Sequence, residues 1–407
     1  MNEALSHDVA VIGAGPAGLA AALAIARLGL RVAAIGAIPP GRDTRTAALF
    51  AGSVTLLDNL GIGDECRAAG EPIAGIRIVD DMGSFLRAPE VTFAARDVGL
   101  ERFGYNIPNS VLTGAMRARG LELPQLDLID AAVTRVTPQP EHVEIEIAGG
   151  ETLAVRLVIG ADGRRSLCRQ SAGIAERSWR YEQSAVTCTF AHGRPHGGIS
   201  TEFHRRTGPF TVVPSPGQTS SLVWVERPDE AERLAALDEP GFRQALEARL
   251  QGLLGPVGSI GPRGVFPLTG MSAETAGRSR IALVGEAVHV IPPIGAQGLN
   301  LGLRDVACIA DCVADAVAAG GDIGAPEVLD AYARMRSTDI TSRVWSIDLL
   351  NRTLLSRAIP VQAIRGIGMH ALKAVAPLRQ LAIREGLGPS FLAPRLMQPA
   401  AGKPGAP

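Results

Sequence analysis

Apolar and polar positions at the start of the chain follow a strand, helix, strand order. Asp8 to Ile12 and Arg31 to Ile35 are short apolar runs, as expected of buried strands. The alanine- and leucine-rich segment between them predicts a helix through Leu28, which Gly29 ends. This order predicts a βαβ unit, in which a crossover helix joins two parallel strands.

A second strand-to-helix transition lies between Ile281 and Asp305. Ile281 to Val284 is an apolar run that ends at Gly285, and apolar residues recur at helical spacing from Val306 to Val317. The glycines between these two patterns therefore lie at a helix N-terminus. Free N–H groups and the positive end of the helix dipole favour an anion there, or a ring that becomes anionic. The alternative is a glycine-rich turn that serves packing alone.

The remaining pattern indicates further layers. His142 to Ile159 predicts a β-hairpin, and alternating segments from Trp179 to Phe266 predict a separate, mainly β layer. After Asp330 the pattern is helical. From Pro389 onward proline, glycine and alanine dominate, which predicts a disordered tail.

Composition narrows the class of protein. With 407 residues, 46% of them hydrophobic and 20% charged, the chain can bury a large core, and its net charge of −1 gives no reason to expect a nucleic-acid partner. The absence of an apolar run of about 18 residues predicts no membrane span, and the short segment before Asp8 leaves no space for a signal peptide, so we expect a cytoplasmic protein. Cys308 and Cys312 are typical of packing residues, and no metal-ligand spacing is present, so no metal is expected.

Gly13, Gly15 and Gly18 form a G-x-G-x-x-G motif inside the predicted βαβ unit. The first glycine permits a tight turn, the second lets a pyrophosphate approach the backbone, and the third lets helix and strand pack closely. The motif in this context predicts a dinucleotide. It normally includes an acidic side chain at the end of the second strand, which holds the adenosine ribose, but this chain has Gly36 there.

Two further polar positions are candidates with an ordinary alternative each. Arg45 follows in a polar loop, where it can pair with phosphate or cover a cofactor edge, or simply be solvated. Asp162 follows a predicted strand in the segment Gly160 to Arg165, but Asp-Gly is also a common turn.

Three motifs, Gly13 to Gly18, Gly160 to Arg165 and Val284 to Asp305, resemble together those of a known family. The chain resembles the ubiquinone-biosynthesis hydroxylase family of FAD-dependent aromatic monooxygenases, in the para-hydroxybenzoate hydroxylase class. The specific string is Pro292-Pro-Ile-Gly-Ala-Gln-Gly-Leu-Asn-Leu-Gly-Leu-Arg-Asp305, supported by Asp43-Thr-Arg-Thr, Thr207-Gly-Pro-Phe and Tyr332-Ala-Arg-Met-Arg336. The resemblance runs from about residue 7 to residue 388.

This resemblance implies an α/β fold, with a Rossmann-like FAD-binding domain of the GR2 type, an inserted mainly β substrate domain and C-terminal helices. The FAD-binding domain is expected at 1–75, 105–180 and 273–340, and the substrate domain at 76–104 and 181–272. The C-terminal helices are expected at 341–388, before a disordered tail at 389–407.

The resemblance also implies roles for individual residues. The three glycines of the first motif would hold the FAD pyrophosphate, with Asp162 near it. Arg45 and Asn109 would contact phosphate or flavin, and Gly295, Leu299 and Asn300 would meet the isoalloxazine ring. The remaining predicted wall of the flavin site consists of Pro292, Pro293 and Gln297.

Two positions depart from the family pattern. The family normally has Glu where Gly36 stands, and Asp, which holds the ribityl chain, where Glu286 stands. Changing Gly36→Glu or Glu286→Asp is therefore expected to tighten FAD binding, each by an amount on the order of a kcal/mol.

The chemistry implied is hydroxylation of an electron-rich aromatic ring, with NAD(P)H as reductant, O2 as oxidant and a flavin hydroperoxide as the oxygen donor. No side-chain nucleophile is then needed, and His289 is expected to be structural. A disulfide-reductase relative is excluded by the lack of a second glycine motif and redox cysteine pair, and a flavin halogenase by the lack of W-x-W-x-I-P. A polyprenyl reductase, and a weakly FAD-binding, non-catalytic member of a quinone-biosynthesis complex, remain as alternatives.

Charge is concentrated at the C-terminal end. Arg343 to Pro407 holds nine basic and two acidic residues, a net charge of +7, against −8 for the rest of the chain. Apolar residues lie between the basic ones, a pattern typical of helices that contact an anionic membrane or a partner on it. The hydrophobic aromatic substrate implied by the resemblance would come from there, which predicts a peripheral contact with the inner membrane or a quinone-biosynthesis complex. The alternative is an ordinary pair of helices with its arginines in water.

Overall fold

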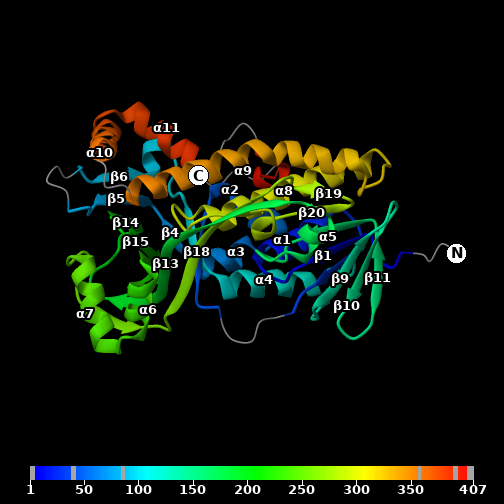
Figure 1. Cartoon of the computed structure of the whole chain (residues 1–407), viewed down its shortest axis with the longest axis horizontal. Helices are drawn as coiled ribbons and strands as arrows, with labels where there is room; N and C mark the ends of the chain where they lie inside the picture. The colour runs from blue at the N-terminus through cyan, green and yellow to red at the C-terminus, as the bar shows by residue number, and fades with distance from the viewer. Residues whose placement is uncertain (1–4, 38–42, 84–87, 356–358, 388–392, 401–407) are drawn as a thin grey trace.

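The computed structural model of the chain describes residues 5–37, 43–83, 88–355, 359–387 and 393–400. Figure 1 shows a six-stranded sheet and its helices at one end of the molecule and a larger, mainly β part at the other, with long helices running between the two. The mixed α/β fold confirms the predicted fold class.

The six-stranded sheet is built from the buried apolar runs. Its order is β19-β20-β12-β1-β2-β8; all neighbours are parallel except β19 and β20. Every residue of β1, β2, β12 and β20 is buried, because helices cover both faces of such a sheet. The strands are β1 (Val9–Ile12), β2 (Val32–Ile35), β8 (Leu126–Ile129), β12 (Leu157–Gly160), β19 (Gly277–Arg278) and β20 (Ile281–Leu283).

Helices packed on this sheet come from separate parts of the chain. They include α1 (Pro16–Ala26), α4 (Asn109–Leu121), the short α5 (Leu167–Ser171) and α8 (Gln297–Ala318). An antiparallel sheet of β9 (Val133–Pro138), β10 (Val143–Ile147) and β11 (Thr152–Val155) extends beside them, and the β10–β11 hairpin is the one predicted from the sequence.

The larger sheet has nine strands. Its path is β21-β18-β13-β16-β15-β14-β5-β6, with β17 paired to β13. Helices α6 (Pro228–Ala236) and α7 (Glu239–Leu250) pack against it around Phe210, Trp224 and Phe242. The strands are β5 (Gly75–Asp80), β6 (Val91–Ala94), β13 (Glu176–His192), β14 (Ile199–Arg205), β15 (Gly208–Ser215), β16 (Thr219–Glu226), β17 (Val257–Ile260), β18 (Gly264–Ala273) and β21 (His289–Val290).

A small sheet and several short helices lie between the two larger sheets. The sheet has the order β3-β7-β4, and a hydrogen bond from Thr46 Oγ1 to Ser221 Oγ ties β3 to β16 of the nine-stranded sheet. The elements are β3 (Thr46–Phe50), α2 (Ala51–Leu60), α3 (Gly63–Ala68), β4 (Glu71–Ile73), η1 (Ala95–Val98), β7 (Gly104–Pro108) and η2 (Gly285–Ala287).

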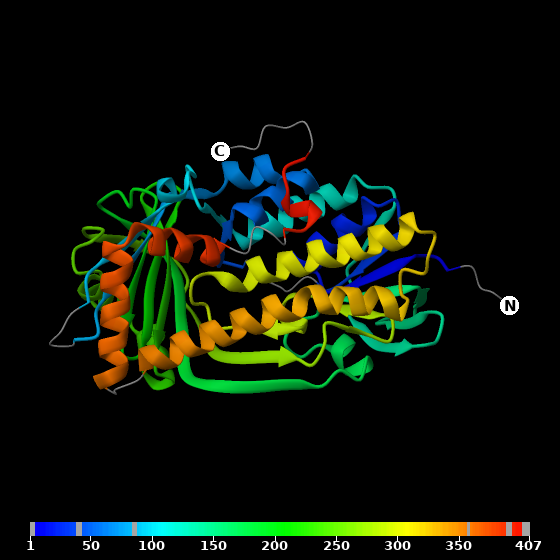
Figure 2. The same cartoon turned by 90° about the horizontal axis from the view of Figure 1, so that it is seen from above.

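Helices dominate the C-terminal part. The long α9 (Pro326–Leu355) runs beside α8, and α10 (Ile359–Ala374) and α11 (Ala376–Leu387) follow near β6 and η1 (Figure 2). Within the described ranges no helix is both long and apolar enough to cross a bilayer.

The prediction of a disordered tail from residue 389 is wrong for residues 393–400. This segment contains η4 (Arg395–Met397), Met397 is buried, and Asn59 Nδ2 donates to the carbonyl oxygen of Leu396 at 2.9 Å. Composition missed it because its anchors are on α2 and α8, far away in sequence. The predicted tail residues 389–392 and 401–407 lie outside the described residues.

Candidate functional site

The predicted site residues meet at one edge of the six-stranded sheet. Gly13 follows β1, Gly36 follows β2, Asp162 follows β12 and Glu286 follows β20 by a few residues. Because these four strands are parallel, their carboxyl ends lie at the same edge, which is where open α/β sheets bind ligands. The fold therefore brings the three sequence motifs together.

The glycine turn between β1 and α1 needs its first and third glycines. Gly13 has φ +125°, and a Cβ there would overlap the carbonyl oxygen of Ala161. A Cβ on Gly18 would overlap the carbonyl oxygen of Gly13. Gly15 is different, because nothing lies within 4 Å of the position of its Cβ. This open cradle at the N-terminus of α1 fits a pyrophosphate, whose oxygens accept hydrogen bonds from free backbone N–H groups.

Gly36 is closed in by the same turn. A Cβ at this position would lie 2.5 Å from the backbone nitrogen of Ala14 and 3.0 Å from the carbonyl carbon of Gly13. A side chain here therefore requires the glycine turn itself to move. This corrects the expectation that Gly36→Glu simply restores a ribose contact, since the sequence gave no sign of the close approach.

Asp162 has partners inside the protein. Its carboxylate accepts hydrogen bonds from Ser166 Oγ at 2.6 Å and from the backbone N–H of Cys168 at 3.0 Å. These bonds fix the start of α5, while the Asp-Gly turn lies against Gly13. The position near the glycine turn agrees with the predicted site, and a role in holding pyrophosphate stays a prediction.

Glu286 is paired with a residue to which the sequence analysis gave no role. Arg164 Nε donates to Glu286 Oε2 at 3.0 Å, and both side chains are about half exposed, at 48% and 56%. The buried Arg169 holds the two loops together, donating to the carbonyl oxygens of Ala287 and Arg164 at 2.8 Å. Arg164 lies within the predicted Gly160 to Arg165 motif, but only the fold shows that it faces Glu286.

Arg45 and Asn109 form a polar cluster with Asp43. Arg45 donates to Asp43 through Nε at 2.9 Å and Nη2 at 2.8 Å, and Asn109 Nδ2 donates to the same carboxylate at 3.1 Å. Burial raises the pKa of Asp43, but these hydrogen bonds and the charge of Arg45 outweigh it and lower the pKa to about 2. The Arg45 guanidinium also lies 5.5 Å from the ring centre of Phe266.

Asn109 retains one unused group. Its Oδ1 is buried and has no hydrogen-bond partner within the protein. A buried polar atom without a partner is costly, and a ligand can supply the missing donor. Together with the open cradle at Gly15, this atom indicates that the residues present fit a bound dinucleotide.

The turn before α8 has an unusual backbone. Gly295 has φ +63°, and Ala296, the residue that precedes the first turn of α8, has φ +54°. A left-handed conformation costs a residue with a Cβ roughly 1–2 kcal/mol, so the surroundings must impose it. Pro293, Gly295 and Gly298 are exposed, whereas Pro292 is buried and supports the predicted wall from behind.

Asn300 is the main support of this turn. Its Oδ1 accepts from Phe50 N at 2.9 Å and Ser53 Oγ at 2.8 Å, while its Nδ2 donates to the carbonyl oxygens of Ala48 and Ala296. All of its hydrogen-bonding capacity is thus used within the protein. Asn300 fixes the turn for a ring instead of binding one through its amide; Leu299, half-buried beside it, stays a predicted contact.

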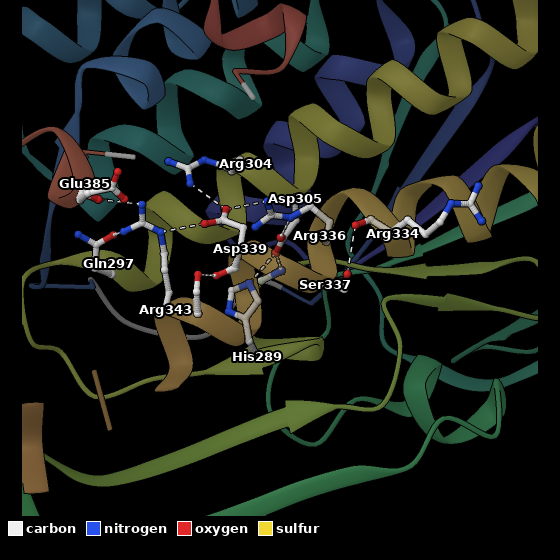
Figure 3. Close-up of polar contacts among 12 residues, drawn as sticks. His289, Gln297, Arg304, Asp305, Arg334, Arg336, Ser337, Asp339, Arg343 and Glu385 are labelled. Carbon is white, nitrogen blue, oxygen red and sulfur yellow. Dashed lines mark hydrogen bonds and ion pairs between the residues drawn. The ribbon is translucent and has the colours of Figure 1, made fainter. Parts of the chain in front are cut away.

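A buried ionic cluster lies behind the turn (Figure 3). Asp305 Oδ2 accepts from His289 Nε2 at 2.7 Å and from the backbone N–H of Gly285 at 2.9 Å, and Asp305 Oδ1 accepts from Arg336 Nε at 2.6 Å. Burial opposes the charge of Asp305, yet His289 and Arg336 hold its pKa below the usual value. His289 is 2% exposed, in agreement with the structural role predicted for it.

Known proteins share both the sequence pattern and the fold. Residues 6–344 match the protein family described as FAD binding domain. The chain is 36% identical over 401 residues to a ubiquinone hydroxylase of Rhodospirillum rubrum, covering 96% of this chain and 92% of that protein. It is 29% identical over 390 residues to the 3-demethoxyubiquinol 3-hydroxylase of Escherichia coli, covering 94% and 98% of the two chains.

Solved structures agree on the fold. The p-nitrophenol 4-monooxygenase of Pseudomonas putida superposes with a TM-score of 0.77 at 20% identity, covering 96% of this chain and 98% of that one. A probable FAD-dependent monooxygenase of Pseudomonas aeruginosa superposes with a TM-score of 0.75 at 19% identity, covering 89% and 99%.

Proposed function

The chain belongs to the family of FAD-dependent monooxygenases that includes ubiquinone hydroxylases, and from this premise we propose that it hydroxylates the aromatic ring of a polyprenylated quinone precursor. NAD(P)H is the reductant and O2 the oxidant. The observation that carries the proposal is the turn from Gly295 to Asn300. It presents the N-terminus of α8 at the edge where the glycine motif and the Glu286 loop also lie.

FAD, when bound, supplies the activation of oxygen. The protein has three tasks toward it: binding, orientation and exclusion of water. Gly13, Gly15 and Gly18 would hold the pyrophosphate, with Arg45, Asn109 and Asp162 near it. The positive end of the α8 dipole at Gln297 would favour negative charge on the ring when it is reduced.

Exclusion of water depends on the surfaces around the turn. Pro293, and Phe266 on β18, expose apolar atoms near Arg45 and the turn, and both belong to elements held by the ordered core. A site closed by such surfaces protects a reactive oxygen adduct from water. No proton-transferring side chain is assigned, because His289 is already bonded to Asp305.

A test of this function uses a hydroquinone or phenol with a short isoprenyl tail. The purified protein should be yellow, with a flavin spectrum, and it should consume NAD(P)H and O2 faster when this substrate is present. Mass spectrometry should show one added oxygen in the product. Colourless protein that excess FAD does not reconstitute would instead support a non-catalytic member of a quinone-biosynthesis complex, and a reduced tail with an unchanged ring would indicate a polyprenyl reductase.

We also propose that α9–α11 contact the membrane that holds such a substrate. Large hydrophobic residues support this, since eight of the eleven that are exposed in the described chain lie between residues 335 and 381. They are Met335, Trp345, Leu349, Leu350, Ile367, Val375, Leu378 and Leu381. A concentration of exposed apolar residues in one region is characteristic of an interaction surface.

The charge argument needs a correction. Several of the nine basic residues counted in the sequence are engaged inside the protein: Arg343 pairs with Asp339, Arg379 with Asp97, and Arg395 with Asp311 and Asp315. Lys373 and Arg384 are exposed on α10 and α11. The apolar residues therefore carry the proposal, and an anionic surface would add to it through few cations.

Sedimentation with anionic liposomes tests the contact. Leu378→Ser with Leu381→Ser should reduce the bound fraction severalfold, and Lys373→Gln with Arg384→Gln should reduce it mainly at low salt. Leu121→Ser is a matched control, because Leu121 is 77% exposed but lies on α4. Binding that none of these changes reduces, or no binding at low salt, would leave α9–α11 as ordinary packed helices.

A further inference from the structure

Three guanidinium groups share two carboxylates between α8 and α9. Asp339 accepts from Arg304 and Arg336 at 2.8 Å and from Arg343 at 3.0 Å, while Asp305 pairs with Arg336. None of these five side chains is more than 15% exposed. The cluster therefore carries one excess positive charge close to the N-terminus of α8, where the helix dipole is positive as well.

Arg343 is the member of this cluster that reaches the flavin-facing turn. Its Nε donates to Asp339, and its Nη1 donates to Gln297 Oε1 at 2.9 Å. Its Nη2 donates to the carbonyl oxygen of Glu385, in the last turn of α11, at 3.2 Å. Figure 3 shows Arg343 between Gln297 and Glu385, with Asp339 on its other side.

Gln297 completes the same connection. It is the first residue of α8, and its Nε2 donates to the carbonyl oxygens of Gly386 at 3.0 Å and Gly295 at 3.2 Å. The last four carbonyl groups of a helix lack partners within that helix, and a cation near them is favourable. The N-terminus of α8 and the C-terminus of α11 are thus joined through one amide and one guanidinium.

Helix α11 is also fixed at other points along its length. Ile383 is buried with Phe50 and Phe103, and Ala296 packs against this group. Arg379 and Gln380 bind Asp97 in η1, at 3.2 Å to its carboxylate and 3.0 Å to its carbonyl oxygen. The inner side of α11 therefore lies against the turn before α8, while Leu378 and Leu381 are exposed on it.

We propose that Arg343 is a positioning residue for the flavin: acting through Gln297, it holds the first turn of α8 in place and makes that position depend on the docking of α11. Ala296 adopts its left-handed conformation between two fixed points, Asn300 on one side and the Gln297–Arg343 pair on the other. Loosening the second point lets the turn relax. The inference rests on the proposed function only in that FAD is the bound ligand.

The test measures FAD dissociation and the flavin midpoint potential in the full-length protein. Arg343→Met should weaken FAD binding about tenfold, as expected for loss of a charge-assisted hydrogen bond, and should move the potential to more negative values. The protein should still fold, because Asp339 keeps Arg304 and Arg336 as partners. Arg343→Lys, which retains the charge, should recover most of the potential but only part of the affinity.

Arg334→Met is the matched control, since Arg334 lies on the same helix with an exposed side chain that points away from the cluster (Figure 3). It should leave both quantities unchanged. In a double-mutant cycle, Gln297→Met and Arg343→Met should be strongly non-additive, and so should Ile383→Ser and Arg343→Met. Additive effects, or an Arg343→Met protein with wild-type affinity and potential, would overturn the inference even if the wild type hydroxylates its substrate. Wild-type protein that binds FAD but forms no hydroxylated product would overturn only the proposed function.

Discussion

The glycine turn at the edge of the six-stranded sheet and the C-terminal helices α9–α11 differ in how far sequence determines their role. At the turn, each glycine has a local geometric reason: Gly13 and Gly18 lack space for a Cβ, and Gly15 faces open space. In α9–α11, basic residues of one type have opposite environments, since Arg343 is buried among ions whereas Lys373 is exposed. Backbone geometry can be inferred from a short motif, but the environment of a charge depends on residues far away in sequence.

Removing one carboxylate from the buried cluster should have the largest effect. Asp305→Asn leaves Arg336, which is 1% exposed, without that counter-charge, and breaking a buried pair of this kind costs about 3–5 kcal/mol. Denaturant unfolding measures the change. Asp315→Asn is the control, because its partner Arg395 and Asp315 itself are exposed, and such pairs contribute roughly 0–1 kcal/mol. Equal costs for the two changes would contradict the described burial.

Gly13→Ala should be the next most damaging change. The new Cβ meets the Ala161 carbonyl group in a left-handed conformation, so an overpacking cost of about 1–3 kcal/mol adds to the backbone strain. FAD should then be lost on purification. Gly15→Ala, whose Cβ has free space, should fold as well as the wild type but bind FAD more weakly, as followed by flavin fluorescence. An unfolded Gly15→Ala protein would show that the cradle is not open.

Gly36→Ala sharpens the comparison within the turn itself. Because its Cβ would lie 2.5 Å from Ala14 N, we expect lower stability and a larger FAD dissociation constant, by an amount on the order of a kcal/mol. Gly36→Glu should behave in the same way unless the turn shifts. Tighter binding by the Glu variant would mean that the turn does move and that a ribose contact was missing.

Glu286→Asp should have a smaller effect, of the opposite sign. The shorter side chain loses its reach to Arg164 and leaves its carboxylate available to the cofactor, so FAD should bind more tightly by about 0.5–1.5 kcal/mol. Calorimetric titration of apoprotein with FAD measures this. Arg164→Gln, which also frees Glu286, is the companion variant, and weaker binding by both would show that the Arg164–Glu286 pair itself contacts FAD.

The smallest effect concerns the five cysteines, all of which are buried. Burial raises the pKa of the Cys66, Cys188 and Cys308 thiols from 9.0 to about 12 and that of Cys312 to about 11. The thiols keep their protons in the folded state, so their contribution to stability is complete below pH 9 and is lost as the pH rises through 11 to 12. Iodoacetamide at pH 8 should label unfolded but not native protein. Rapid labelling of native protein would contradict this burial.

Sequence alone was sufficient for the fold class and for the order of the three motifs, because each depends on local patterns. It was not sufficient for the partners of the site residues. Arg164 pairs with Glu286 from 122 positions away, and Gln297 contacts Gly386 from 89 positions away. It also counted Arg343 among surface charges, since nothing near it in sequence shows that Asp339 and Gln297 would surround it.

The central claim is that the protein inserts oxygen from O2 into an aromatic ring while FAD is bound at the edge of the six-stranded sheet. The most direct measurement is a single-turnover reaction under isotopically heavy O2, with FAD-loaded protein, NAD(P)H and a short-tailed isoprenyl phenol. We predict a hydroxylated product that carries one heavy oxygen atom on its ring, and none from the Gly13→Ala protein. A product whose ring oxygen comes from water, or NAD(P)H oxidation that yields only hydrogen peroxide with this class of substrate, would contradict the claim.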